Sequence, residues 1–214
     1  MDKNYWTNYY KKYGVNKDII QSSSFAKFIS NKYLLKKKFN IIELGSGNGR
    51  DAIFLAQQKH NIIALDQSIE GMDAIRKIVD TDISNYFHPK KSDFVLEDYS
   101  KYKNVDMFYS RFSIHSITKN DELVLLPKIY DALAVDGLFC IEARTTKDPI
   151  CGIGENCGEN TYIKDNHKRR FIETKEFRTQ VSELGFTEIY FIEQKNLSIV
   201  KNDNPTLMRI VLKK

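Results

Sequence analysis

Short apolar runs alternate with amphipathic stretches through the middle of the chain. Runs rich in Ile, Leu, Val and Phe are typical of buried strands and cover 39–44, 61–65, 105–109 and 138–143, and a weaker strand precedes Asp93. Helical spacing covers 50–59, 121–134 and a segment that is capped by Ser68 and places Met72, Ile75 and Val79 on one side. Because strands alternate with helices, the pattern predicts a doubly wound α/β sheet of parallel strands.

The C-terminal part of the chain has a different rhythm. A helix is predicted from Thr174 to Leu184, where Gly185 ends it, and two strands follow at 187–193 and 206–212. Asn-Asp-Asn-Pro lies between them, which favours an antiparallel pair that closes the sheet. The predicted fold is therefore a mostly parallel seven-stranded sheet with an antiparallel C-terminal strand pair.

Residues 145–170 are polar, contain glycines and show no period. A loop of this length inside a compact domain is usually either functional or disordered. We interpret it as a functional insertion. The helix at 121–134 is expected to end through a turn at Asp136-Gly137 before the strand that follows.

Composition narrows the class of protein. A length of 214 residues fits one domain, and 42% hydrophobic residues exclude intrinsic disorder. No apolar run approaches the roughly 20 residues that cross a bilayer, and the N-terminus lacks the apolar core of a signal peptide. We expect a cytoplasmic protein without membrane insertion.

Charge and cysteines exclude further classes. The net charge of +5 comes from short Lys runs, and no zinc finger, aromatic RNA-binding motif or long basic helix accompanies them, so a nucleic-acid partner is not expected. Cys140, Cys151 and Cys157 are too few for a disulfide framework, and the last two form a poor metal site, so no metal is expected. Arginine is sparse in this Lys-rich chain, which suggests that its planar guanidinium groups bind phosphate or carboxylate groups.

A glycine-rich turn follows the first strand. In Ile41–Arg50 the glycines alternate at 45, 47 and 49, where they permit a tight turn and the close approach of a ligand. A dinucleotide fingerprint would need a small residue where Arg50 stands, and the Gly-Lys-Ser/Thr of a phosphate loop is absent. Both nucleotide-phosphate interpretations therefore fail.

The spacing E-x-G-x-G-x-G resembles motif I of the class I S-adenosylmethionine-dependent methyltransferases, which have a Rossmann-like fold. The resemblance implies an acidic Glu43 beneath the turn, Asp66 on the ribose diol, and Asp93 and Phe94 at the adenine. It implies S-adenosyl-L-methionine as cofactor. The cofactor-binding residues that we predict are Trp6, Tyr10, Glu43, Gly45, Ser46, Gly47, Gly49, Asp66, Gln67, Asp93, Phe94 and Ser110.

Other segments resemble a narrower group. Tyr109–Ile117, Phe139–Asp148 and Asp165–Phe177 are similar to tellurite-resistance-like methyltransferases, and in particular to those proposed to methylate the phosphoramidate of Campylobacter capsule. This resemblance implies a single domain over 1–214, with an N-terminal helical lid at 1–38 and a substrate loop at 145–170. It implies O-methylation of a small anionic phosphoramidate or phosphate precursor in capsular polysaccharide biosynthesis.

Several cationic residues belong at the carboxyl edge of the sheet or in loops above it, where they could hold such an anion. They are Arg111, His115, Arg144, His167, Arg169 and Arg170. Other interpretations stay open: Arg111 pairs with an acidic residue, His115 is a satisfied buried histidine, Arg169 and Arg170 are solvated, and Trp6 and Tyr10 only pack.

Methyl transfer is an in-line displacement for which the protein chiefly aligns the reacting atoms. A hydroxyl acceptor would use a general base, for which His115 and His167 are the candidates, whereas an anionic acceptor needs none. Three alternatives remain. They are a hydroxyl acceptor with a general base, an oxyanion acceptor such as tellurite, and a cofactor-binding partner protein without catalysis.

Overall fold

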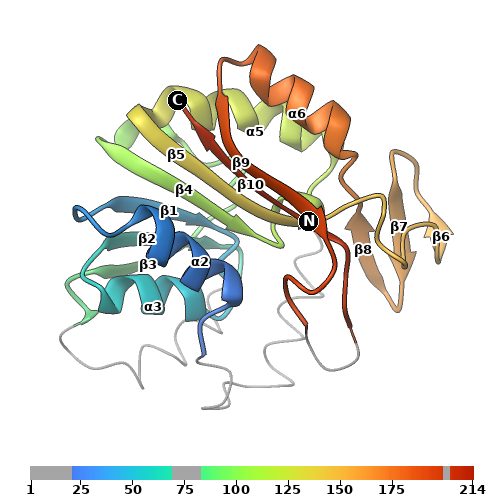
Figure 1. Cartoon of the computed structure of the whole chain (residues 1–214), viewed down its shortest axis with the longest axis horizontal. Coiled ribbons are helices and arrows are strands. Elements are labelled where there is room, and N and C mark those ends of the chain that lie inside the picture. The colour runs from blue at the N-terminus through green and yellow to red at the C-terminus, as the bar shows by residue number, and fades with distance from the viewer. Residues whose placement is uncertain (1–20, 69–82, 200–202) are drawn as a thin grey trace.

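A seven-stranded sheet forms the centre of the structure, a computed structural model that describes residues 21–68, 83–199 and 203–214 (Figure 1). Its strand order is β3-β2-β1-β4-β5-β10-β9. The strands are β1 (Asn40–Leu44), β2 (Asn61–Asp66), β3 (Phe87–Lys91), β4 (Val105–Arg111), β5 (Leu133–Arg144), β9 (Thr187–Gln194) and β10 (Leu207–Lys213). The first five run parallel, and β10 is antiparallel to both β5 and β9. The predicted fold class is confirmed.

Two helical layers cover the sheet. α2 (Ser24–Tyr33) and α3 (Arg50–Gln57) lie on one face, and α5 (Lys119–Ala132) and α6 (Thr174–Glu183) lie on the other (Figure 1). Alternate residues of each strand enter the two cores, as the period of two requires. In β1, Ile42 packs in the core under α5 and α6, while Ile41 packs under α2 and α3.

The boundary between α5 and β5 differs from the prediction. Thr118 and Asp121 form a capping box, so the helix begins at Lys119, and it ends at Ala132 rather than at residue 134. Asp136, with φ of 63°, does not lie in a separate turn but inside β5, where the register against β4 shifts. Leu133 pairs with Val105, and pairing with β4 resumes only at Leu138, so Asp136-Gly137 forms an irregular part of β5.

The insertion at 145–170 is not an irregular loop, which corrects the prediction. It folds into a small antiparallel sheet of β6 (Glu155–Asn156), β7 (Thr161–Lys164) and β8 (His167–Arg170), drawn beside one end of the main sheet in Figure 1. Asp165 and Asn166 both have positive φ, as a two-residue hairpin turn requires.

Two regions of the prediction lie outside the described residues. They are the helix after Ser68, with Met72, Ile75 and Val79, and the first part of the lid, with Trp6 and Tyr10. The rest of the lid segment contains α2, which is a core element: Phe25 is fully buried and its ring stacks on Tyr109 at 5.2 Å.

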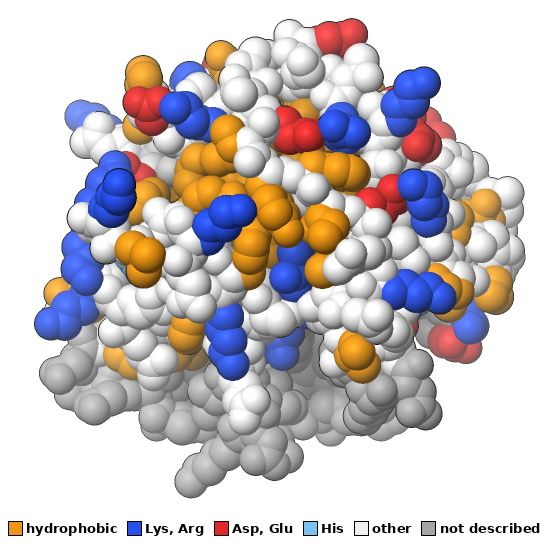
Figure 2. Space-filling view, in the orientation of Figure 1, with side chains coloured by type: hydrophobic (Ala, Val, Ile, Leu, Met, Phe, Trp, Pro, Cys, Tyr) orange, Lys and Arg blue, Asp and Glu red, His pale blue; other side chains and the backbone are white. Residues whose placement is uncertain are grey.

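Apolar side chains gather in the middle of the face that Figure 2 shows. Where α2 packs against β9, the centroids of the Phe28 and Tyr190 rings lie 4.8 Å apart, and the Lys32 ammonium lies 4.4 Å from the centroid of the Tyr190 ring.

The cysteines are free thiols: Cys140 is buried, Cys151 is half-buried and Cys157 is exposed. Across the described ranges, no helix is long and apolar enough to span a bilayer.

Candidate functional site

The glycine turn after β1 lies directly against the turn after β4. Gly45, Gly47 and Gly49 have φ of 68°, 58° and 74°, the left-handed region that glycine adopts without strain. A Cβ at Gly45 would also come within 2.8 Å of the Cβ of Ser113. Any larger residue at position 45 would therefore separate the two turns.

Glu43 lies in β1 beneath this turn and is buried. Burial, followed by the nearby carboxylates of Asp51 and Asp66, raises its pKa well above the usual value. Its Oε2 atom is buried and has no hydrogen-bond partner within the described part of the chain. A buried carboxyl oxygen in this state favours a cationic or hydrogen-bond-donating ligand.

The acidic residues that end β2 and follow β3 lie close to the glycine turn. Asp66 Oδ2 accepts a hydrogen bond from the Gly47 amide at 2.8 Å, and its Oδ1 accepts one from the Ser68 amide at 2.8 Å. Gln67 Nε2 donates to Asp93 Oδ2 at 2.5 Å, which joins the two segments. The structure therefore brings Asp66, Gln67 and Asp93 together at the carboxyl edge of the sheet, as predicted.

Three other predicted cofactor residues support the turn from within. Ser46 is buried, and its amide donates to the Leu65 carbonyl at 2.9 Å. Ser110 is buried, and its hydroxyl lies 2.6 Å from that of Ser113. Phe94 was expected to offer apolar surface to an adenine, but its ring is 1% exposed and lies beneath Gly45, so it is a core residue.

The arginines do not form an open anion pocket, which corrects the prediction. Arg111 donates to Glu142 at 2.9 Å and to Ser198 at 2.9 Å. Arg144 pairs with Asp148 at 2.9 Å and with Asp203. Because guanidinium forks bind carboxylates as readily as phosphates, acidic residues of the chain itself already engage these two.

Arg170 is the most enclosed of the predicted arginines. Its guanidinium donates to the carbonyls of Ile117 and Ile114 at 3.0 and 3.2 Å and pairs with the buried Glu122. It therefore fastens β8 to η4 (Ile114–Ser116), the turn after β4. These contacts hold the turn in place, and they engage the guanidinium that was predicted to bind substrate.

His115 is buried in η4, and the Arg144 backbone amide donates to its Nδ1 at 3.1 Å. Burial is the largest cause that lowers its pKa well below the usual value, followed by the charges of Arg144, His167, Arg169 and Arg170. The structure therefore places these four predicted residues near the imidazole of His115. Arg111 lies apart from them, near Glu43, where its charge offsets part of the rise in the pKa of that carboxyl that burial causes.

Sequence reasoning missed several residues that build the site. Asp51 accepts hydrogen bonds from the Ser23 hydroxyl at 2.7 Å and from the Tyr109 hydroxyl at 2.8 Å, which joins α2, α3 and β4. Glu142 is buried between Arg111 and Arg209. A carboxylate inside the apolar run 138–143 was the available signal, because such a residue is buried only with partners.

No protein-family model and no curated protein sequence matches the chain. Solved structures do match. The glycopeptide N-methyltransferase MtfA has a TM-score of 0.67 at 15% identity, over 91% of this chain and 97% of that one. A 1,6-didemethyltoxoflavin-N1-methyltransferase from Burkholderia thailandensis has a TM-score of 0.71 at 14% identity, over 99% and 86%.

A SAM-dependent methyltransferase from Methanosarcina mazei has a TM-score of 0.72 at 12% identity, over 87% of this chain and 96% of that one. The chain has the class I methyltransferase fold. At these identities the likeness carries the fold alone. Within the methyltransferase fold, the glycine turn, Glu43, Asp66 and Asp93 all lie at the carboxyl edge of the parallel strands, where ligands bind in open α/β sheets.

Proposed function

We propose that the chain is an S-adenosyl-L-methionine-dependent methyltransferase for a small acceptor. The observation that carries this proposal is the buried Glu43 carboxyl, whose Oε2 lacks a partner among the described residues beneath a left-handed glycine turn. S-adenosyl-L-methionine bears an ammonium and a sulfonium, and cations of this kind complete such a site. MtfA, which shares the fold, was crystallised with S-adenosyl-L-methionine and with S-adenosyl-L-homocysteine.

The residues fit the cofactor in charge and placement. Glu43 would face its cationic end, the turn at 45–49 would permit close approach, and the Asp66 carboxylate would accept from the ribose hydroxyls. Asp93 and Gln67 would border the base. When bound, the cofactor supplies an electrophilic methyl group. The chain would hold the acceptor in line with that group and exclude water.

For the acceptor we propose an anion, and specifically a phosphoramidate of the kind found in capsular polysaccharide precursors. The support is the nearness to Gly45 of the turn that carries His115, together with His167 and Arg169, which lie near this imidazole beside the carboxylate-paired Arg144 and Arg170. An oxyanion such as tellurite shares this chemistry. A neutral hydroxyl acceptor would need a base, and the acceptor assays below separate the three classes.

A cofactor-binding protein without catalysis is the other candidate function. The intact cofactor site fits both possibilities, so binding alone does not separate them. Turnover with phosphoramidate esters, tellurite and neutral alcohols does. Methylation of any of these acceptors contradicts the binding-only function.

The test of cofactor binding uses two variants. Asp66→Ala removes hydrogen bonds to the ribose, and Glu43→Gln removes the carboxylate that would face the cationic end. Each should weaken S-adenosyl-L-methionine at least several-fold by titration calorimetry, because charge-assisted hydrogen bonds contribute roughly 1.5–3 kcal/mol. Glu155→Gln, on the exposed β6, is the matched control and should bind normally. Unchanged affinity in both variants would contradict the proposed site.

A further inference from the structure

The turn after β4 brings one imidazole next to the glycine turn. Ser113 lies against Gly45, so close that a Cβ on the glycine would be 2.8 Å from the serine Cβ. His115 follows two residues later in η4 and is 5% exposed. The turn that carries His115 therefore lies beside the glycine turn, at the carboxyl edge of the sheet.

Contacts from three directions fix this ring. Arg170 donates to the carbonyls of Ile114 and Ile117, which flank His115 in sequence. The Phe112 ring lies 5.4 Å from the imidazole. Phe112 itself adopts φ of 59°, the left-handed region that non-glycine residues rarely enter, so the turn is held in one particular conformation.

The third contact decides the tautomer. The backbone N–H of Arg144 donates to His115 Nδ1 at 3.1 Å. A nitrogen that accepts a hydrogen bond carries no proton, so the neutral ring must carry its proton on Nε2. Within the described ranges of the chain, no hydrogen bond involves Nε2, and this atom is not among the fully buried polar atoms that lack a partner, so it reaches the surface. It is thus an N–H donor that is available to a ligand.

The surroundings keep this ring neutral. Arg144 on β5 and His167, Arg169 and Arg170 on β8 face it, and together with burial they lower the pKa of His115 well below the usual range. A general base needs a free lone pair, but the lone pair on Nδ1 is engaged by Arg144 and Nε2 has none.

We propose that His115 donates an Nε2–H hydrogen bond to an anionic oxygen of the acceptor and is not a general base. The inference rests on the proposed methyltransferase function and names the acceptor class, an oxyanion such as a phosphoramidate. A neighbouring oxygen of the same group forms its bond to the methyl carbon while the carbon–sulfur bond breaks and the sulfonium becomes a thioether. No proton leaves, because the attacking oxygen carries none.

The tautomer can be measured without turnover. Long-range ¹H–¹⁵N spectra of ¹⁵N-histidine-labelled protein distinguish the two nitrogens of each ring, and His115→Gln assigns the signal among the 4 histidines. We expect a neutral Nε2–H form of His115 from pH 6 to 8. A neutral Nδ1–H form or an imidazolium over this range would overturn the proposal, whatever the enzyme does.

Two isosteric variants separate the roles in catalysis. His115→Gln retains an N–H donor near the Nε2 position but not the acceptor for Arg144, whereas His115→Asn retains an acceptor near Nδ1 but not the donor. With O-ethyl phosphoramidate as the probe, we expect His115→Gln to keep kcat/KM within about three-fold of the wild-type value. We expect kcat/KM of His115→Asn to fall about ten- to hundred-fold. His88→Gln, on the exposed side of β3, is the matched control.

Three other results would overturn either the proposed role of His115 or the proposed function. Equal loss in both variants, with the acidic limb of the pH–rate profile removed, would assign His115 as a base and overturn the proposal. Loss in Gln alone would assign a purely structural role and also overturn it. If wild-type protein binds no S-adenosyl-L-methionine, the proposed function fails instead, and the Nε2–H signal then still reports the donor geometry.

Discussion

Glu43 and Glu97 are both buried carboxyl groups, but their surroundings have opposite effects. Glu43 has carboxylates as neighbours, and its raised pKa means that the unliganded fold loses stability as pH rises above 4.5, the ordinary value. Glu97 instead accepts from Lys90 at 2.8 Å and Tyr102 at 3.0 Å, and Lys101 lies at 2.6 Å. In the proposed function the first carboxyl faces a ligand, whereas the second stabilises the fold.

Glu97→Gln should show this second role. Burial alone would raise the pKa of Glu97, but hydrogen bonds from Lys101, Lys90, Ser92 and Tyr102 outweigh it and lower the pKa to about 2. The stability from Glu97 is therefore present above pH 4.5 and is lost as pH falls towards 2. We expect the variant to be about 2–3 kcal/mol less stable at pH 7 by urea unfolding.

This deficit should narrow as pH falls below 4.5, because the wild-type carboxyl then takes up a proton. Glu183→Gln, on the exposed side of α6, serves as the control and should change stability by less than about 0.5 kcal/mol. A deficit for Glu97→Gln that stays constant between pH 7 and pH 3 would contradict this account.

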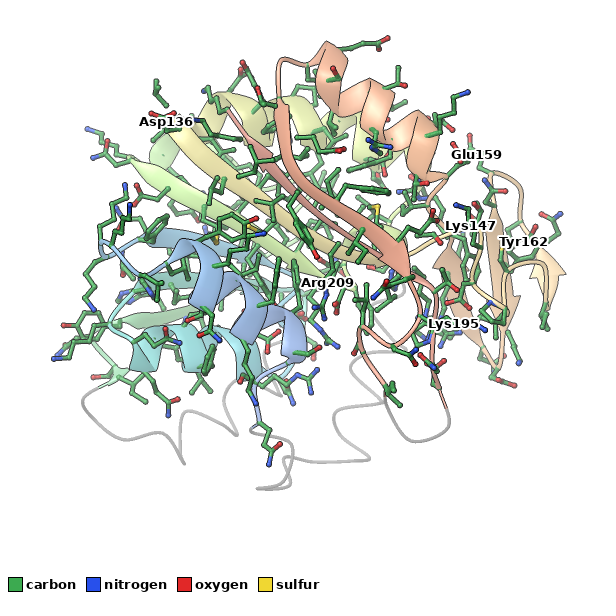
Figure 3. All side chains as sticks on the ribbon, in the orientation of Figure 1. Asp136, Lys147, Glu159, Tyr162, Lys195 and Arg209 are labelled. Atoms are coloured by element: carbon green, nitrogen blue, oxygen red, sulfur yellow. The ribbon has the colours of Figure 1, made fainter. Side chains whose placement is uncertain are left out.

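At the scale of elements, one buried carboxylate joins three strands and a helix. Glu142 in β5 pairs with Arg111 in β4 at 2.9 Å and with Arg209 in β10 at 2.6 Å. Arg209, which Figure 3 labels near the start of β10 and beside α2, also donates to Ser24 Oγ and to the Leu197 carbonyl at 2.8 Å. The triad therefore fastens α2 and the segment after β9 to the sheet.

Glu142→Gln should break this joint. The variant leaves the buried Arg209 and the half-buried Arg111 without their anion, and removing one partner of a buried ion pair costs about 3–5 kcal/mol. Amide exchange should rise at Ser24 and Leu197, which depend on Arg209. Glu188→Gln breaks only the exposed pair with Arg178 and should cost less than about 1 kcal/mol. Equal costs would show that the triad adds no more than a surface pair.

The sequence predicted the main strands because their apolar runs are buried on both faces, a pattern that local chemistry carries by itself. It missed β7 and β8 because these strands are short and polar, with several half-exposed residues. Only the Asp165-Asn166 dipeptide pointed to a hairpin there. The start of β5 at Leu133 was also hidden, since it depends on pairing with Val105, far away in sequence.

At the scale of the whole molecule, the sequence predicted the edge of the sheet where the candidate site lies, but not the ion-pair partners of its arginines. The carboxyl edge followed from strand direction, and the resemblance to class I methyltransferases named Glu43, Asp66 and Asp93 there. The partners of the arginines could not be named in advance. Arg144 meets Asp203 across 59 residues, and Arg170 meets Glu122 across 48. No local pattern reports that each cation already has a carboxylate.

The topology also predicts where a ligand protects the chain. S-adenosyl-L-methionine at 100 times its dissociation constant should stabilise the fold by about 2.7 kcal/mol. Slowed amide exchange should concentrate at 45–49, 66–68 and 93–95. The opposite edge, where Asp136 lies in Figure 3, should exchange at an unchanged rate. Protection spread evenly over both edges would contradict a site at the carboxyl edge.

Because the three thiols differ in exposure, a thiol reagent should label the unmutated chain selectively at one position. Cys140 is sealed in the core, where burial raises its pKa, and burial also raises the pKa of the half-buried Cys151. Cys157 alone is exposed, in the turn between β6 and β7. A maleimide fluorophore should therefore attach there first. Its emission would then report on changes in the small sheet, whose strand β8 carries residues near His115.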